Sequence, residues 1–272
     1  MSNFSSIGFA VQTEDDFKKL VGLCFDKGQS IKCSDGTYFI YSDNSGAELY
    51  GQLNNQNEVI GMNPHFNGKS HRKVCLTESY LRPESELDGA FYCWADPQNE
   101  NEPESGACPF VFDVPNFKTI GQINYPKTFE IQLSAFAQEI EFYDDEQSFS
   151  DKQNPIGEGE KELKFASQSF IPSGLFNDNE NSTPQATVFF AGTIKEWKRL
   201  TNENTNESFN WLLVETLGGE VDILSDLKLT DREPKPGGVA QGVFWLSGKL
   251  LTLPFQNEIV KPNKTFWKKL FG

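Results

Sequence analysis

The feature that most constrains the fold of this chain is a change of hydrophobic period near residue 28. Thr13 can cap a helix, and the acidic residues 14–16 place negative charge where a helix dipole is positive. Apolar residues then recur at helical spacing: Phe17, Leu20, Val21 and Cys24. Lys27 and Gly28 are typical of a helix C-terminus. We therefore expect one amphipathic helix that ends near Gly28.

Most apolar segments outside this helix read as strands, and after it the dominant period is two. We expect strands at residues 7–11, 37–42, 47–53, 58–62, 88–95, 109–114, 129–143, 187–194, 209–216, 220–224 and 239–250. The second half of 129–143 also fits a helix. Residues 217–219 (Leu-Gly-Gly) predict a tight hairpin, and residues 144–162 read as a charged loop. The pattern favours an α+β protein that is mainly β.

The order of these elements predicts two domains. Residues 1–118 carry the strand–helix–strands pattern of an α+β domain. Residues 119–272 read as a β-rich domain, OB-like or of a similar small-barrel kind, because glycines inside strands (Gly192, Gly242 and Gly248) favour the bends that close a barrel. The domain ends in a basic-aromatic C-terminal tail, "VKPNKTFWKKLFG", which fits either a short helix against a membrane or partner, or a segment folded back on the acidic protein.

Charge limits the partners of this chain. Its 24 Lys and Arg residues against 39 Asp and Glu residues give a formal net charge of −15. Such a chain repels nucleic-acid phosphates and anionic lipids, so we expect another protein, neutral or basic, as the partner and no nucleic acid. No segment approaches the ~20 apolar residues of a membrane span, and the N-terminus lacks the pattern of a signal peptide.

The five cysteines are odd in number, widely spaced and free of C-x-x-C pairs. This usage is typical of a reducing compartment, and it argues against a disulfide framework and against a cysteine zinc site. We therefore expect a soluble cytoplasmic protein.

The stretch "GMNPHFNGKSHR" (61–72) contains both histidines and comes close to a phosphate-binding loop. The pattern G-x-x-x-x-G-K-[S/T] requires a glycine five residues before Gly68, and Asn63 stands there. The residues that follow Ser70 place Val74 and Leu76 at strand spacing, where a phosphate loop would lead into a helix. The sequence therefore argues against a nucleotide site and indicates a turn-rich connection between strands.

The same stretch is the candidate metal site. His65 and His71 are six residues apart, a spacing that fits neither one helix face nor alternate strand positions, but a loop can bring them together. Glu48 or Glu78 would add a carboxylate. The strand–helix–strands order over about the first 55 residues resembles the βαβββ module of glyoxalase-like (vicinal oxygen chelate) metalloenzymes, and that resemblance implies a catalytic metal near His65. The alternative is a packed loop histidine bonded to backbone.

No catalytic set is recognisable elsewhere in the sequence. There is no G-x-S-x-G motif, and the carboxylate clusters read as solvated charge. Phe244 and Trp245 could stack a nucleobase in a barrel, but burial explains them better because no basic groove accompanies them. We expect a non-catalytic protein-binding or accessory/inhibitory factor without a cofactor. The alternatives are a glyoxalase-like metal enzyme and a nucleic-acid-binding barrel, which the charge disfavours.

Overall fold

The computed structural model describes all residues except 1, 84, 154–163, 177–182, 253–258 and 261–272. This part of the chain is an α+β, mainly β fold with two α-helices, α1 (Glu14–Lys27) and α2 (Glu146–Lys152). The predicted fold class is confirmed at this level. None of the described helices has the length and apolar character needed to cross a membrane. The predicted basic-aromatic tail begins at Val260, and its remaining residues, 261–272, lie outside the described part of the chain.

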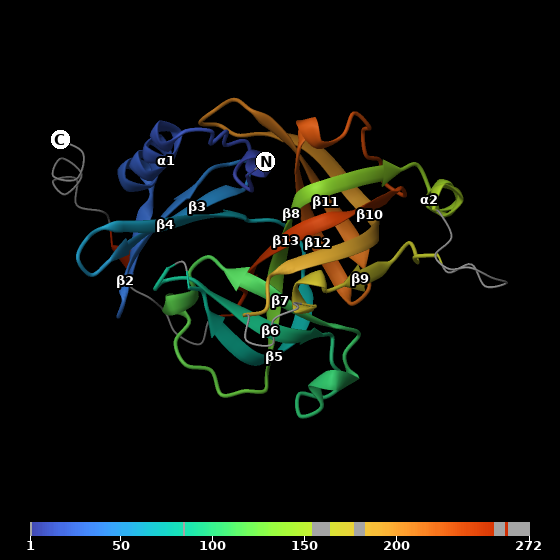
Figure 1. The fold of residues 1–272 in the computed structure, drawn as a ribbon, viewed down its shortest axis with the longest axis horizontal. Coiled ribbons are helices and arrows are strands. Elements are labelled where there is room, and N and C mark those ends of the chain that lie inside the picture. The colour runs from blue at the N-terminus through green and yellow to red at the C-terminus, as the bar shows by residue number, and fades with distance from the viewer. Residues whose placement is uncertain (1, 84, 154–163, 177–182, 253–258, 261–272) are drawn as a thin grey trace.

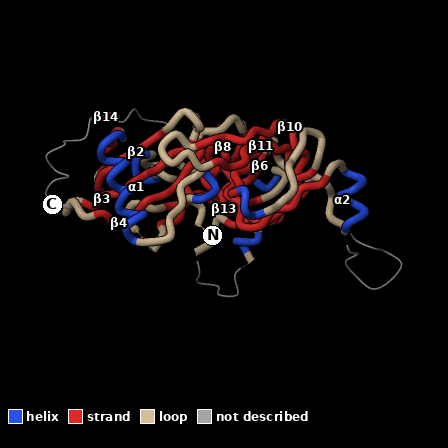
Figure 2. Tube along the Cα trace, turned by 90° about the horizontal axis from the view of Figure 1, so that it is seen from above, coloured by secondary structure: helices blue, strands red, loops and turns tan. Residues whose placement is uncertain are grey.

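Helix α1 and the strands that follow it form one end of the molecule (Figures 1 and 2). Thr13 caps α1, as the sequence predicts, and it also forms a capping box with Asp16. The five-stranded sheet has the order β14 (Ile259–Val260), β1 (Gln29–Cys33), β2 (Gly36–Ser42), β3 (Ala47–Asn54) and β4 (Val59–Phe66). Its neighbouring strands are all antiparallel. The Phe25 ring of α1 packs 4.1 Å from the Phe39 ring of β2.

The second sheet has nine strands and fills the rest of the fold. They are β5 (Arg72–Leu81), β6 (Gly89–Ala95), β7 (Pro109–Val114), β8 (Lys127–Tyr143), β9 (Ser169–Ile171), β10 (Thr187–Thr201), β11 (Ser208–Thr216), β12 (Gly219–Asp226) and β13 (Val239–Leu250). The strands β8, β12, β11, β10 and β13 pair in a closed cycle. Strands β5, β6 and β7 connect β8 to β13 on a second route, through a single β7–β13 bridge at Asp113 and Ser247.

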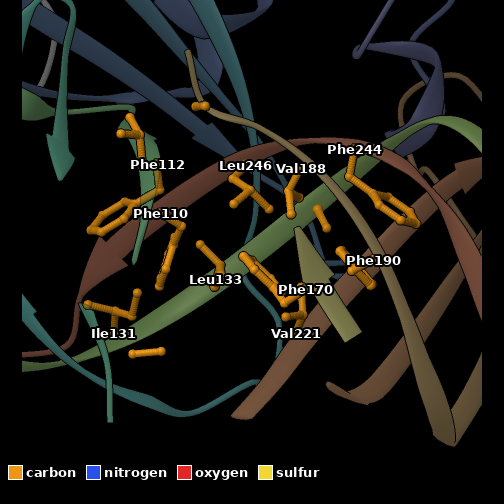
Figure 3. Close-up of a cluster of buried hydrophobic side chains, with 14 of the residues drawn as sticks. Phe110, Phe112, Ile131, Leu133, Phe170, Val188, Phe190, Val221, Phe244 and Leu246 are labelled. Carbon is orange, nitrogen blue, oxygen red and sulfur yellow. The ribbon is translucent and has the colours of Figure 1, made fainter. Parts of the chain in front are cut away.

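Two hydrophobic clusters lie on opposite faces of the cycle of strands. The first lies between the strands of the large sheet and is rich in phenylalanine, including Phe110, Phe170, Phe190 and Phe244 (Figure 3). The Phe190 and Phe244 rings stack at 4.1 Å. The second lies between the outer face of β11 and the α1 sheet, where Trp211 joins side chains of α1, β2 and β3. The N-terminal elements are therefore packed on the large sheet.

The large sheet also contains strands from both sides of the predicted boundary at residues 118 and 119. Strands β5, β6 and β7 precede this boundary and pair with β8 and β13, which follow it. The division into two domains stays a prediction.

Residues 7–11 do not form the predicted strand. A 3₁₀ turn covers Ser5–Ile7 and ends at Gly8, whose φ is 82°. The following backbone is bonded to the β10–β11 connection: the Asn202 amide donates to the Ile7 carbonyl, and the Thr205 hydroxyl donates to the Gly8 carbonyl. Ile7 and Phe9 are nevertheless buried. The apolar pattern of residues 7–11 therefore predicted burial correctly. The backbone carbonyls of this segment accept hydrogen bonds from side chains and not from a neighbouring strand.

The two other segments of uncertain type are resolved by packing. Residues 127–143 form one continuous strand, β8, so the helical alternative for its second half is wrong. This half pairs along its length with β13. Within the predicted loop 144–162, residues 146–152 form α2, which Asp145 caps and which buries Phe149. The Asp145 cap and the burial of the Phe149 ring stabilise this short helix.

Candidate functional site

Strand β4 extends to Phe66, so His65 lies in a strand and not in the predicted loop. In the β3–β4 register His65 stands directly opposite Glu48. Opposed residues of an antiparallel pair share one face of a sheet, and this face is turned toward β8 and β13, where His65 and Glu48 have their partners. The structure therefore brings together two of the three predicted metal-site residues.

Both ring nitrogens of the buried His65 are used in hydrogen bonds. Nε2 lies 2.9 Å from Gln132 Oε1, which only accepts, so Nε2 carries the proton. Nδ1 then accepts from the Ser247 hydroxyl at 2.8 Å. Burial lowers the pKa of His65 well below 6.5, the positive charge of Lys249 lowers it further, and the hydrogen bond to Gln132 opposes them. His65 therefore lies between the two sheets with both ring nitrogens in hydrogen bonds.

The hydrogen-bonded chain continues from His65 to Asp222. The Gln132 amide donates to Ser134 Oγ at 2.9 Å and to Asp222 Oδ2 at 2.8 Å. Ser247, His65, Gln132 and Asp222 therefore form one series, and all four side chains are at least 96% buried, with none more than 4% exposed. A serine, a histidine and an aspartate thus occur together, but an amide separates the histidine from the aspartate and no face of the series is open. The arrangement joins the sheets.

Asp222 is held by the loop that resembled a phosphate-binding loop. The backbone nitrogens of Lys69 and Ser70 donate to its two carboxylate oxygens at 3.0 and 2.8 Å. The Trp211 indole donates to Oδ1 at 2.8 Å. A Cβ atom on Gly68 would lie 2.1 Å from Asp222 Oδ2, so only glycine permits this approach. The loop is an anion cradle, and its anion belongs to the same chain.

The remaining predicted metal-site residues have other partners. The Glu48 carboxylate accepts from the Tyr50 hydroxyl at 3.0 Å and pairs with Lys249 Nζ at 2.9 Å. His71 is 62% exposed and lies 3.3 Å from Glu130. Within the described part of the chain, no three His, Cys, Asp or Glu side chains are arranged as a group that could hold a metal ion. The metal site and the enzyme alternative stay predictions.

A polar pocket of about 310 Å³ opens where β4, β7 and β13 meet. We call it the junction pocket; its polar lining consists of Asn63, Arg82, Asp88, Asp113, Gln185 and Trp245. Arg82 Nε lies 2.7 Å from Asp113 Oδ1, and the Trp245 indole donates to Asp113 Oδ2 at 2.6 Å. The Asn63 and Gln52 amides donate to Asp88 Oδ1 at 2.6 and 2.5 Å. Burial raises the pKa of Asp113, Arg82 and Trp245 oppose this, and Asp88 adds to it.

Partly exposed aromatic side chains lie on the outer face of β5 and β6. We call Tyr80, Tyr92, Trp94 and Tyr125, arranged around Glu78, the aromatic face. Tyr92 stands opposite Glu78 in the register, and Trp94 stands opposite Cys75. The Tyr80 hydroxyl donates to Glu78, while Tyr125 lies near both Ser79 and Glu78. Phe91 and Cys93, on the opposite face, belong to the hydrophobic core, and Tyr92 packs against the same core with part of its side chain.

Carboxylates surround the aromatic face. The β6–β7 connection carries Asp96, Glu100, Glu102 and Glu104. It folds against the face, because the Cys75 thiol lies 3.6 Å from the Glu100 carbonyl. Lys73 and Lys127 pair with Asp96 and Glu100 at 3.7 and 3.4 Å. With Glu78 included, five acidic residues stand against two basic ones.

The sequence contains a partial signal for the aromatic face. In "DGAFYCWA" the aromatic residues 92 and 94 alternate with the apolar residues 91 and 93. Period two shows that the two pairs lie on different faces. It does not show which face packs inside, because tyrosine and tryptophan fit a core as well as a surface. The junction pocket has no comparable signal, because its residues come from distant segments.

We compared the chain with protein-family models, with curated proteins and with solved structures, and none of these comparisons found a match.

Proposed function

We propose that this chain is a non-catalytic protein-binding or accessory factor, and that the aromatic face of β5 and β6 contacts its partner. The observation that carries the proposal is the cluster of partly exposed tyrosine and tryptophan side chains on and beside the paired strands β5 and β6. Tyr and Trp are the residue types most enriched where binding energy concentrates, since they bury much surface and lose little side-chain entropy. Strands also fix their side chains before the partner arrives.

The state of the reactive groups supports binding over catalysis. Both nitrogens of His65 are committed to hydrogen bonds, and the ring is buried. Burial raises the pKa of Cys24 to about 12 and that of Cys93 well above 9.0, so neither thiol is a ready nucleophile. The hydrogen bonds of His65 to Gln132 and Ser247 instead join β4 to the large sheet.

We also propose that the closed cycle of β8, β12, β11, β10 and β13 is an OB-like barrel. Its meander β10–β11–β12 supplies three antiparallel strands, and the parallel β12–β8 pair closes the cycle. OB-folds bind nucleic acid on the face of the second and third meander strands. Here Phe209, Trp211 and Leu224 on that face are packed against the α1 sheet. This packing and the net charge of −15 favour a protein partner over nucleic acid.

The proposal is tested by photo-crosslinking from two positions in the cells that make the protein. One variant carries p-benzoylphenylalanine in place of Tyr92, and the control carries it in place of Gln56, which is exposed on the β3–β4 turn. We expect a discrete crosslinked protein from position 92 and none from position 56. The Tyr92→Ser/Trp94→Ser variant should fail to retain that same protein in affinity purification.

Two results would overturn the proposal. One is an adduct pattern at position 92 that matches the pattern at position 56. The other is a double variant that retains the crosslinked protein as well as the wild type does. A far-ultraviolet circular dichroism spectrum of the double variant tests whether its fold is intact, because Tyr92 packs partly against the core.

A further inference from the structure

The second half of strand β5 has a neighbouring strand on one side only. Residues 72–76 pair with β8, and this pairing stops at Leu76, which stands opposite Lys127. A β-bulge follows, and residues 78–81 then pair with β6. In the described part of the chain, no strand pairs with residues 78–81 on the side away from β6. We call this side of residues 78–81 the open edge of β5.

The backbone groups of Ser79 and Leu81 point to the open edge. In an antiparallel pair, residues that exchange backbone hydrogen bonds with their opposite alternate with residues that do not. The Arg82 N–H donates to the Asp88 carbonyl just beyond the last paired residues, so the even-numbered residues of 78–82 are the ones that bond to β6. The N–H and C=O groups of Ser79 and Leu81 therefore face away from β6. Among the described residues, no backbone group is bonded to them.

The open edge is accessible from solvent. Glu78 and Ser79 are exposed. The Leu81 side chain is 61% exposed, and among the large apolar side chains of the described residues only Phe176 is more exposed. Tyr125 reaches this edge through a hydrogen bond to the Ser79 side chain, which leaves the Ser79 backbone groups unpaired. An exposed edge with unpaired backbone groups is a template for one more strand.

We infer that the open edge of β5 binds an extended, basic segment of the protein that contacts the aromatic face, and that this segment pairs with β5 as an added strand. A polypeptide backbone offers N–H and C=O groups at the spacing that Ser79 and Leu81 present. Tyr80 lies between these two residues and belongs to the aromatic face. The segment and the rest of the partner surface therefore form one continuous interface. This inference rests on the proposed function and adds the mode of binding.

The side chains of β5 determine which segment fits. A residue opposite Glu78 or Tyr80 places its side chain on the same sheet face as these two. The Glu78 carboxylate accepts from the Tyr80 hydroxyl and forms no ion pair within the described part of the chain, so it favours a lysine or arginine opposite. The acidic β6–β7 connection adds to this preference. On the other face Leu81 favours an apolar residue. The segment therefore alternates basic and apolar residues.

A second copy of this chain fits the open edge less well than a basic partner does. Two copies that paired through this edge would bring their Glu78 side chains and their acidic β6–β7 connections close together. Like charges on neighbouring strands are destabilising, and a net charge of −15 on each copy adds repulsion over a longer range. The charge therefore protects the edge from self-association and leaves it open to a basic segment.

The test titrates the whole protein with the peptide acetyl-Lys-Val-Lys-Val-Lys-amide and follows the backbone N–H signals of Ser79 and Leu81 by nuclear magnetic resonance. We expect a saturable shift of both signals and slower hydrogen exchange of both amides at saturation. The control peptide carries N-methyl groups on its two valines, whose N–H groups face β5 when lysine stands opposite Glu78. It should bind about tenfold or more weakly, because it lacks these donors. The peptide acetyl-Glu-Val-Glu-Val-Glu-amide should not bind.

Two pairs of variants test the edge from the side of the protein. Ser79→Pro removes an N–H from the open edge, where proline is tolerated in a strand, and should weaken peptide binding by about tenfold or more. Ser79→Ala keeps that N–H and should bind as the wild type does. Glu78→Gln should weaken binding of the lysine peptide by about two- to fivefold. Asp26→Asn changes the total charge equally at the exposed end of α1 and should have no effect.

The inference is overturned if the Ser79 and Leu81 signals do not saturate, if the N-methylated peptide binds as well as its parent, or if the two Ser79 variants bind alike. Shifts of these signals with protein concentration alone would place a second copy at the edge and would also overturn it. The peptide comparison holds even if Ser79→Pro does not fold. Crosslinking at Tyr92 can succeed in each of these cases, so failure of the open edge is distinguishable from failure of the proposed function.

Discussion

The carboxylate of Asp222 lies within the loop formed by Gly68, Lys69 and Ser70, at 3.0 and 2.8 Å from the backbone nitrogens of Lys69 and Ser70. This contact joins the end of the β4–β5 connection to β12 of the large sheet. Glycine, lysine and serine gave the loop the composition of a phosphate cradle, and its backbone does receive an anion. The anion is the Asp222 side chain of the same protein, so the contact holds the loop against β12.

Gly68→Ala should destabilise the fold. The new methyl group would lie 2.1 Å from Asp222 Oδ2, so either the loop or the carboxylate must move. We expect the free energy of unfolding to fall by about 1–3 kcal/mol, measured by urea denaturation. Gly51→Ala is the control, because a Cβ there meets its neighbours at 3.6 Å or more. Equal losses in the two variants would contradict the cradle.

Removal of the Asp222 carboxylate should cost more than its neutralisation. Asp222→Ala leaves the Lys69, Ser70, Trp211 and Gln132 donors without their acceptor. We expect a loss on the order of 3 kcal/mol in the free energy of unfolding. Asp222→Asn keeps one acceptor oxygen and should lose less. Trp211 fluorescence during denaturation reports both, and an alanine variant as stable as the wild type would refute the network.

His65 should make the protein less stable as the pH falls. Its pKa in the folded protein lies well below the ordinary value of 6.5, so below pH 6.5 the unfolded chain binds a proton that the folded chain does not. The free energy of unfolding should therefore decrease below pH 6.5, with a slope of up to about 1.4 kcal/mol per pH unit from this group. Urea denaturation from pH 7.5 to 5 measures it. His65→Gln should lose this slope and His71→Gln should keep it.

Cys33 should be the first thiol to react in the folded protein. All five cysteines are free thiols. Four of them are buried, and Cys33 is partly exposed. Burial raises the pKa of all five thiols, that of Cys24 to about 12, so exposure decides which thiol reacts first. Mass spectrometry after brief iodoacetamide treatment should find one modified site, and all five after denaturation. Rapid native labelling of a Cys33→Ser variant would contradict this.

Much of the fold was predictable from local pattern. The cap at Thr13, the acidic first turn and the 3.6 period define α1, and strands β7 and β13 have the predicted bounds. These features depend on neighbouring residues alone. The strand predicted at residues 7–11 was wrong, because these residues bond to Asn202 and Thr205. For residues 137–143 the sequence left strand and helix open, and pairing with β13 decided for the predicted strand.

The candidate sites divide in the same way. The sequence by itself determined that "GMNPHFNGKSHR" contains both histidines, lacks the first glycine of a phosphate-binding loop, and belongs to an acidic chain. Only the tertiary structure decided that Glu48 faces His65, that Asp222 fills the loop, and that residues 78–81 of β5 pair with β6 alone. The physical reason is that helix caps and periodicity act over a few residues, whereas burial and hydrogen-bond partners depend on which strands pair.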